Sequence, residues 1–557
     1  MGGNQEMKAI SGGKVTTDLG AKSKQHGWRR SWSWLGWIIL VAVLGLLWYL
    51  RTWWHAPLMF IYTNPAIIEA LLIWLLLHWL WFRRRWVGAK VWEYDKTDSQ
   101  GHKTGKRGKV TFRYLWFSYI LVLPALLVAL PLVANVAQKV DIVNRIQYQK
   151  ISRLPDAVKN VRLMPEVVAY RYARDALQLS QYKLGTEHVA LIDGKVSFTF
   201  PLVPDGLLLT FTAKNKGMTY VNATTQERNS QIVWKDMKIG EGMKVTDSLW
   251  WNLHRVRYWV DTEEPYYVPK DGEVYTVVPV IAYDYGFKWG LVYAVPVFAG
   301  SFIVDSQGHI QLVSPTQALE HPVLKDNLIF PEHLSRVYVD AYQYKKGVIN
   351  RFFLHEDQIE IQDVGDNPQP FLMDTQAGLK WFVSAEPYGE SHGVFKIFLV
   401  DARTGDIDLY ELPEDQVLTG PVRALDYVRR SNPLVDWNLF NMVEPLPFVR
   451  DGVLYWKTAV IPNDYAGIAY QAFVDSRNNN VIELKTDREV ADFIAGKLNS
   501  APGPAAPSVP GAPGAPGQPP TPANQQELIK QIRQKMQELD QLLKQLEAQS
   551  SPSGGGR

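Results

Sequence analysis

Cysteine is absent from the 557 residues of this chain. Its absence excludes disulfide bonds, thiolate metal sites, iron–sulfur clusters and cysteine nucleophiles. The redox compartment stays open, because a chain without cysteine suits either environment. An excess of charge of one sign is also absent, since 59 Lys and Arg against 56 Asp and Glu leave a net charge of +3. We therefore expect no nucleic-acid partner, because binding a polyanion calls for a strongly basic surface.

Catalytic and cofactor motifs are absent too. The sequence has no G-x-S-x-G, no Walker loop and no G-x-G-x-x-G between a strand and a helix. His355-Glu356-Asp357 lacks the second histidine, four residues on, of a helical zinc site. Residues 401–406 lack the alternating carboxylates of a calcium loop. We predict that the chain is not an enzyme and holds no catalytic residue, cofactor or metal ion.

Three long apolar runs near the N-terminus predict a membrane protein. They cover residues 34–50, 65–82 and 114–136. The first run can be extended to Trp54, and Arg51 is then its one charged residue. Trp and Tyr gather at their ends, as is typical of membrane interfaces. Buried helices of a soluble protein and a cleaved signal peptide explain three such runs less well. We predict three transmembrane helices within residues 31–136.

The flanking charges predict the orientation. Residues 1–30 carry six Lys and Arg, the loop 83–113 carries ten, and the connection between the first two runs carries only Arg51. Basic segments stay in the cytoplasm. We therefore expect a multi-pass protein of the cell membrane, with a cytoplasmic basic tail (1–30) and a cytoplasmic loop (83–113). Residues 137–497 would then lie outside.

Two ionisable residues interrupt the second apolar run. Glu69 lies near its outer end, and His78 lies deeper, about one turn before Arg83. An ionisable group within a membrane is a candidate for function. With only two such groups, we favour a role in helix packing or at the interface.

A recurring strand–turn–strand pattern organises the outer region. Residues 302–313, 396–412 and 472–484 each contain an apolar strand, then Asp, then a short Gly- or Asn-rich stretch and another strand, and 219–228 is a fainter copy. An Asp or Asn side chain at the start of such a turn caps it, and a glycine takes up positive φ. The predicted turn residues are Asn222, Asp305, Asp401, Gly405 and Asp475.

Two further elements precede each of these turns. Alternating strands begin at 193, 271, 377 and 451, and helical patterns cover 165–181, 248–259, 331–342 and 421–430. The predicted unit is a helix followed by three antiparallel strands. It occurs about four times between residues 160 and 497, which makes the fold class α+β.

The segment Val400-Asp401-Ala402-Arg403-Thr404-Gly405-Asp406-Ile407 resembles the strand–turn ending of the PepSY domain family. The other copies depart from it: Asp305 is followed by Ser306 and Gln307, the copy at Asp475 has Asn in place of Gly, and the copy at Asn222 lacks both Asp and Gly. The resemblance covers roughly residues 160–497 and implies a helix packed on a small antiparallel sheet. It also implies a membrane or cell-surface protein that binds or restrains extracytoplasmic peptidases, without a catalytic residue of its own. The whole chain further resembles bacterial or phage-encoded membrane proteins of unknown function.

The C-terminal segments predict a spacer and a coiled coil. Residues 498–524 are rich in Pro, Gly and Ala, which is typical of an extended linker. We predict an amphipathic helix over residues 525–549 and a flexible tail over 550–557. An isolated helix of this length is marginal in water, so it requires a partner helix, either from a second copy or from another protein. The predicted seam consists of Ile529, Ile532, Met536, Leu539, Leu543 and Leu546.

Together these patterns predict a membrane-anchored extracytoplasmic binding or scaffold protein. Its expected partners are membrane lipid, an extracytoplasmic protein such as a peptidase, and a homo-oligomeric or coiled-coil partner. One alternative is a structural component of a larger membrane or virion assembly. Another is a cell-envelope enzyme with an unrecognised site. An aromatic groove for peptide or glycan on the repeats stays open.

Overall fold

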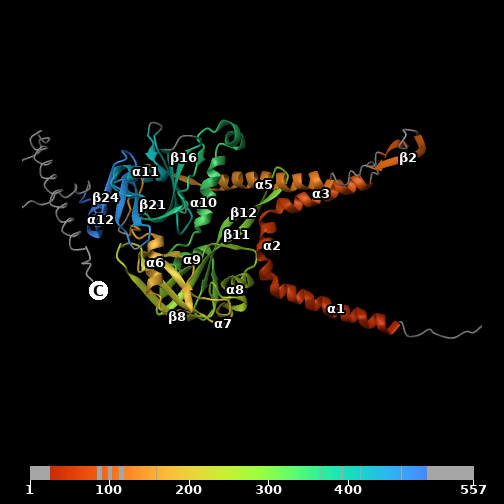
Figure 1. The fold of residues 1–557 in the computed structure, drawn as a ribbon, viewed down its shortest axis with the longest axis horizontal. Coiled ribbons are helices and arrows are strands. Elements are labelled where there is room, and N and C mark those ends of the chain that lie inside the picture. Colours follow the sequence, from red (N-terminus) through yellow and green to blue (C-terminus); the bar gives the residue numbers. More distant parts are fainter. Residues whose placement is uncertain are drawn as a thin grey trace, which may run out of the picture. The chain divides into compact units, whose positions relative to one another are not determined.

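The structure is a computed structural model that describes residues 26–83, 91–97, 103–111 and 118–498, without 158–159, 366, 390–392, 414–415 and 466. Eleven α-helices and several separate β-sheets occur in those ranges (Figure 1). The predicted α+β class is therefore confirmed. The linker, the coiled-coil seam and the C-terminal tail lie outside the described residues, as does the basic tail up to residue 25.

Two helical stretches are long and apolar enough to cross a membrane, by length and composition, within the described ranges. They are Trp34–Thr63 and Ile120–Arg145. Two of the three predicted helices meet this criterion, whereas the apolar part of the middle helix, Pro65–Leu80, is shorter. The helical elements here are α1 (His26–Tyr49), η1 (Leu50–Trp54), α2 (His55–Thr63), α3 (Pro65–Arg83), η2 (Ser118–Val122) and α5 (Leu123–Arg145).

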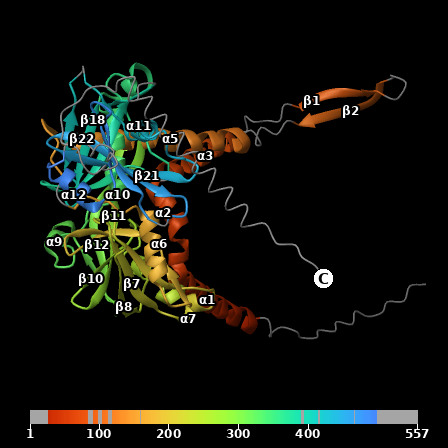
Figure 2. The same cartoon turned by 60° about the vertical axis from the view of Figure 1, so that its left-hand side comes forward.

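The helix α3 lies along α5 in both views (Figures 1 and 2). Small residues make this close approach possible, since Ala66 and Ala70 of α3 and Ala134 of α5 are all buried. Between the two helices, β1 (Val91–Thr97) and β2 (Lys103–Thr111) form an antiparallel pair. The sequence predicted only a basic loop there.

After α5, the chain passes four times through a helix followed by an antiparallel sheet. Unit 1 contains α6 (Glu166–Ala176), β4 (Tyr182–Leu184), β5 (His188–Ile192), β6 (Lys195–Pro204), α7 (Leu209–Thr212), β7 (Asn215–Asn222) and β8 (Ser230–Met237). Unit 2 contains α8 (Leu249–Val256), β9 (Asp261–Thr262), β10 (Tyr266–Lys270), β11 (Glu273–Lys288), β12 (Leu291–Val304) and β13 (Ile310–Val313), with η3 (Val245–Asp247) before it and α9 (Pro315–Glu320) after it.

Units 3 and 4 follow the same order. Unit 3 contains α10 (Glu332–Asp340), η4 (Ala341–Tyr344), η5 (Asn350–Leu354), β14 (Ile359–Glu360), β15 (Phe371–Thr375), β16 (Gly378–Pro387), β17 (Gly393–Val394), β18 (Lys396–Asp401) and β19 (Ile407–Glu411). Unit 4 contains α11 (Pro421–Ser431), β21 (Phe440–Arg450), β22 (Val453–Pro462), β23 (Tyr470–Asp475) and β24 (Val481–Leu484), with β20 (Leu418–Thr419) before it and α12 (Asp487–Ile494) after it.

The sheets have more strands than the three of the predicted unit: five in units 1 and 2, six in the sheet of unit 3 and four in unit 4. Unit 4, for example, is the antiparallel meander β21-β22-β23-β24. One additional strand precedes the Asp-Gly turn, with which the predicted unit begins. Asp451 and Gly452 form a two-residue hairpin turn with φ values of 53° and 72°, which matches the twist of the strands that it joins. Asp193-Gly194 and Asp271-Gly272 form the corresponding turns of units 1 and 2.

One hydrophobic cluster joins all four units, beside further clusters within single units or pairs of units. A single cluster of buried side chains includes Phe198 of unit 1, Ile281 of unit 2, Trp381 of unit 3 and Ile461 of unit 4. In unit 1 the helix α6 covers β6, β7 and β8 (Figure 2). The strand β3 (Tyr148–Ile151), directly after α5, pairs in parallel with β19 and ties α5 to unit 3. The sequence did not predict this strand.

Candidate functional site

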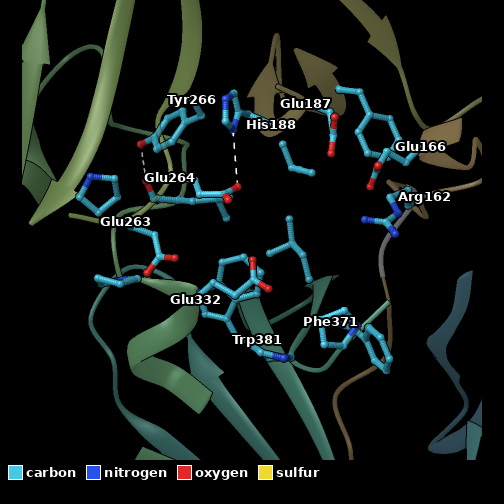
Figure 3. A pocket seen from close by; sticks show the side chains of 18 of the residues that line it. Arg162, Glu166, Glu187, His188, Glu263, Glu264, Tyr266, Glu332, Phe371 and Trp381 are labelled. Atoms are coloured by element: carbon cyan, nitrogen blue, oxygen red, sulfur yellow. Dashed lines mark hydrogen bonds and ion pairs between the residues drawn. The ribbon is translucent and has the colours of Figure 1, made fainter. Parts of the chain in front are cut away.

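A cavity of about 410 Å³ lies where units 1, 2 and 3 meet (Figure 3). Unit 1 contributes α6 and β5, unit 2 contributes β10 and the segment before it, and unit 3 contributes the start of α10 together with β15 and β16. Leu446 of unit 4 completes the lining. The site therefore exists only when the sheets are assembled around the common core.

The lining of this cavity is acidic. Five glutamates face two potential cations, Arg162 and His188. Figure 3 shows the carboxyl groups of Glu187, Glu264 and Glu332 directed into the same space. The five are Glu166, Glu187, Glu263, Glu264 and Glu332.

The start of α10 brings two of these carboxyls together. The backbone N–H of His333 donates to Glu263 Oε2 at 3.2 Å, so a side chain of unit 2 satisfies an amide in the first turn of α10. The side-chain carboxyl of Glu332, the first residue of α10, has no hydrogen-bond partner among the described residues. Burial raises its pKa to about 8, and the nearby carboxyls of Glu263 and Glu264 act in the same direction. Burial also raises the pKa of Glu263, to about 7.

A second acidic group lies at the start of α6. Burial, together with the nearby carboxyls of Glu187 and Glu444, raises the pKa of Glu166 to about 7. Arg162 forms an ion pair with Glu444 at 2.7 Å, and the other Glu444 oxygen accepts the backbone N–H of Glu166 at 2.7 Å. Glu444 has a φ of 49° in a β-bulge of β21, which turns its carboxylate toward this point. The charge of Arg162 is thus already balanced by a residue outside the cavity lining.

The only histidine of the lining is also engaged. His188 Nε2 lies 3.2 Å from Glu241 Oε2, and His188 Nδ1 lies 3.9 Å from Glu264 Oε2. The hydroxyl of Tyr267 donates to the same Glu241 oxygen at 2.6 Å. Burial of this network raises the pKa of Tyr267, which therefore stays protonated. Within the described part of the chain, Arg162 and His188 form no ion pair with Glu332, Glu263 or Glu187. The negative charge of these three carboxylates is therefore not balanced by a cation of the lining.

Aromatic side chains form the rest of the wall. Tyr266, whose hydroxyl donates to the carbonyl oxygen of Leu328, and Phe371 line the cavity. The indole N–H of Trp381 donates to Phe330 O at 3.1 Å and orients its ring. Aromatic faces and carboxylates are the two surfaces to which ammonium and guanidinium groups bind.

Metal binding does not follow from this arrangement. In the described ranges, no group of three or more His, Asp or Glu side chains is placed to hold a metal ion. The carboxyls lie around a wide space instead of converging on one point. Carboxylates beside aromatic rings are a type of surface to which organic cations bind.

The structure places the five predicted turn residues at the ends of strands in four different sheets and not in the cavity. Asp401 Oδ1 accepts the backbone N–H groups of Arg403 and Thr404, at 2.9 and 3.0 Å. Asp475 Oδ1 accepts the N–H of Arg477 at 2.8 Å. Asp305 Oδ1 accepts that of His309, and Asn222 Oδ1 that of Thr224, both at 2.9 Å.

Gly405 lies close to a residue of the cavity lining. Its φ is 85°, and a Cβ there would lie 2.3 Å from the ring of Phe330, which lines the cavity. The turn of unit 3 therefore supports the aromatic wall from behind. The seam residues Ile529 to Leu546 lie outside the described residues.

The sequence did not point to the five glutamates. Glu166 and Glu332 share one signal, because each follows a proline and opens the helix of its unit. A glutamate in the first turn usually interacts favourably with the positive end of the helix dipole. Because this role is common, the sequence alone provides no reason to place Glu166 and Glu332 in one cavity. Glu263 and Glu264 lie in a short connection without a motif.

Comparisons with protein-family models, with curated proteins and with solved structures found no match for this chain. The resemblance to PepSY domains therefore stays a prediction.

Proposed function

We propose that this chain is a membrane-anchored binding protein whose cavity takes a positively charged group, such as a lysine or arginine side chain of a partner protein. The observation that carries the proposal is the imbalance of the lining. Five glutamates meet one arginine and one histidine, and both cations have a carboxylate partner already. A bound cation would allow the buried carboxyls to ionise, and cation–π contact with the aromatic wall would add to the affinity.

The anchoring part of the proposal concerns α1, α3 and α5. The apolar stretches in α1 and α5 would carry the chain through the bilayer, and α3 would return it along α5. The basic residues of 1–30 and 83–113 support a cytoplasmic location of both segments. The four units would then lie on the outer side of the cell membrane, where a partner protein can reach them.

The resemblance of units 1 to 4 to PepSY domains also favours a protein that binds an extracytoplasmic partner. Their order of helix and antiparallel sheet agrees with the fold that the resemblance implies. The partner would be an extracytoplasmic protein with an exposed basic segment, for instance a peptidase. The coiled-coil segment 525–549 would hold two copies, or a copy and a partner, together.

Binding of a tetralysine peptide to the full chain in detergent, measured by calorimetry, tests the proposal. We expect binding that Glu332→Gln weakens about tenfold, which corresponds to about 1.4 kcal/mol. Glu332 suits this test because it has no hydrogen-bond partner in the described residues. The matched control is Glu227→Gln, since Glu227 is exposed on unit 1 and does not line the cavity.

The pH dependence gives a second readout. Protons compete with the ligand for Glu332 and Glu263, whose pKa values are raised to about 8 and 7. Affinity for tetralysine should therefore rise between pH 6 and pH 9, and less so in Glu332→Gln. Equal affinities of the Glu332→Gln and Glu227→Gln variants, or no pH dependence, would contradict a cation site in this cavity.

A further inference from the structure

The hairpin formed by β11 and β12 is longer than its counterparts. The central strand β11 has 16 residues, whereas β6, β16 and β22, which follow the corresponding turns in the other units, each have 10. The hairpin closes in a two-residue turn at Trp289-Gly290, where Lys288 pairs with Leu291. The fold of a unit does not require this extension, because three units form without it.

One side of the extension packs on the membrane helices. Glu69 Oε1 of α3 accepts the backbone N–H of Val292 at 3.0 Å. From the opposite face of the hairpin, the hydroxyl of Tyr285 donates to the carbonyl oxygen of Tyr62 in α2 at 2.9 Å. Leu291, Tyr293 and Val295 of β12 are buried in one cluster with Ala66 of α3 and with Ala134 and Ala137 of α5.

The direction of the hairpin follows from its contacts with α5. Asp284 lies 3.7 Å from Arg145, the last residue of α5, while the side-chain amide of Gln138 donates to Ala294, closer to the turn. The hairpin therefore runs along α5 toward its apolar N-terminal part. Its turn lies four residues, or about 13 Å, beyond Asp284. That distance corresponds to about nine residues of helix, which places the turn near residue 136 of α5.

The other side of the extension carries exposed aromatic residues. Tyr285, Phe287 and Trp289 occupy every second position and are 47%, 72% and 52% exposed. The alternation puts Tyr285 and Phe287 on one face of the hairpin, and Trp289 follows in the turn. Large aromatic side chains exposed together, at the depth where apolar helices begin, are typical of residues at a membrane interface.

We propose that the tip of the β11–β12 hairpin inserts Phe287 and Trp289 among the lipid headgroups of the outer leaflet. The inference rests on the membrane anchoring proposed above. Lys288 between the two aromatic residues can reach the phosphates, as amphipathic side chains do at an interface. The hairpin would thus be a second attachment that holds the cavity-bearing units close to the bilayer.

Site-directed spin labelling tests the insertion directly, because the chain has no cysteine. The full chain carrying Phe287→Cys would be labelled with a nitroxide and reconstituted into vesicles of phosphatidylcholine and phosphatidylglycerol. Oxygen partitions into the bilayer, and a nickel chelate stays in water. We expect the label at 287 to collide with oxygen more often, and with nickel several-fold less often, than a label in water.

Two further labels serve as controls. Lys270 pairs with Glu273 at the opposite end of β11, about 50 Å from the tip, so Lys270→Cys should report water. Leu40→Cys, on the exposed apolar surface of α1, should report the bilayer interior.

The outcomes separate the two proposals. A label at 287 that behaves like the one at 270, while the label at 40 reports lipid, would overturn the hairpin insertion alone. A label at 287 that is immobile and shielded from both reagents would indicate a protein partner in place of lipid, and would overturn it as well. If the label at position 40 collides with the nickel chelate as often as a label in water does, the membrane anchoring is overturned and the hairpin insertion with it.

Discussion

Asp401 has two tasks at the turn of unit 3. Its Oδ1 caps the turn, and its Oδ2 lies 3.2 Å from the ammonium group of Lys380 in β16. Lys380 is 6% exposed and also lies 3.2 Å from Asp408 Oδ2. A buried ammonium group that loses a carboxylate partner is costly. The turn motif in the sequence predicts that Asp401 caps the turn, but it does not predict the ion pair with Lys380.

The sequence alone predicts that Asp401→Asn is mild, since Asn keeps the capping oxygen. With Lys380 buried against it, we expect this substitution to lower the free energy of unfolding by about 1–3 kcal/mol, because Asp408 still offsets part of the charge. The matched control is Asp475→Asn in unit 4. Asp475 caps the same kind of turn and forms no ion pair in the described part of the chain, so the loss should stay below about 0.5 kcal/mol.

Chemical denaturation of the full chain in detergent, followed by circular dichroism, measures both variants. Equal losses for Asp401→Asn and Asp475→Asn would show that Lys380 does not depend on Asp401.

At the scale of elements, α12 closes unit 4. Phe493 is fully buried, with its ring centroid 4.8 Å from that of Phe473 and 5.5 Å from that of Tyr455. A capping box begins the helix: Glu489 N–H donates to Thr486 Oγ1, and the Glu489 carboxylate accepts Thr486 N–H. The sequence analysis ends the outer region at residue 497 but does not predict this helix, because eight residues show too little periodicity.

A chain that ends at Lys485 should therefore be less stable than one that ends at Leu498. Burial of Phe493 alone contributes about 1.5–3 kcal/mol, and the cap about 1 kcal/mol. The chain ending at Leu498 is the control, since it also lacks the linker and the coiled-coil segment but keeps α12. Thermal unfolding of both in detergent decides the matter, and identical melting temperatures would mean that α12 adds nothing to unit 4.

At the scale of the whole molecule, assembly through residues 525–549 remains a prediction from the heptad pattern. Replacing Leu539 and Leu543 by Asp places two charges in the predicted seam, where burial without partners is costly. We expect Leu539→Asp/Leu543→Asp to lower the mass of the detergent-solubilised protein, or to release a partner, without changing the melting of the four units.

The control adds the same two charges away from the seam. Gln534 and Gln541 occupy the heptad positions opposite the apolar stripe, so Gln534→Asp/Gln541→Asp should leave the mass unchanged. Light scattering with correction for detergent measures both variants. If the two double variants have the same mass and partners as the unaltered chain, the heptad does not drive assembly.

The sequence by itself determined the features that depend on neighbouring residues. The α+β class follows from alternating strands and helical patterns, and the helices that begin at Glu166, Leu249, Glu332 and Pro421 lie within the segments with helical periodicity. Two stretches long and apolar enough to cross a membrane follow from composition in the same way. In each case the cause is local: side-chain periodicity, turn chemistry and hydropathy act over a few residues.

Only the tertiary structure decided where distant residues meet. The cavity joins Glu166 to Glu332 across 166 positions of sequence, and β3 pairs with β19 although more than 250 residues separate them. The extended β11–β12 hairpin packs against α3 and α5, and only this contact places its tip beside the apolar helices. Such contacts depend on how the sheets pack around the cluster that joins the units. The spacing of residues along the chain does not predict this packing. Each glutamate, taken alone, has the sequence context of an ordinary surface or helix-capping residue.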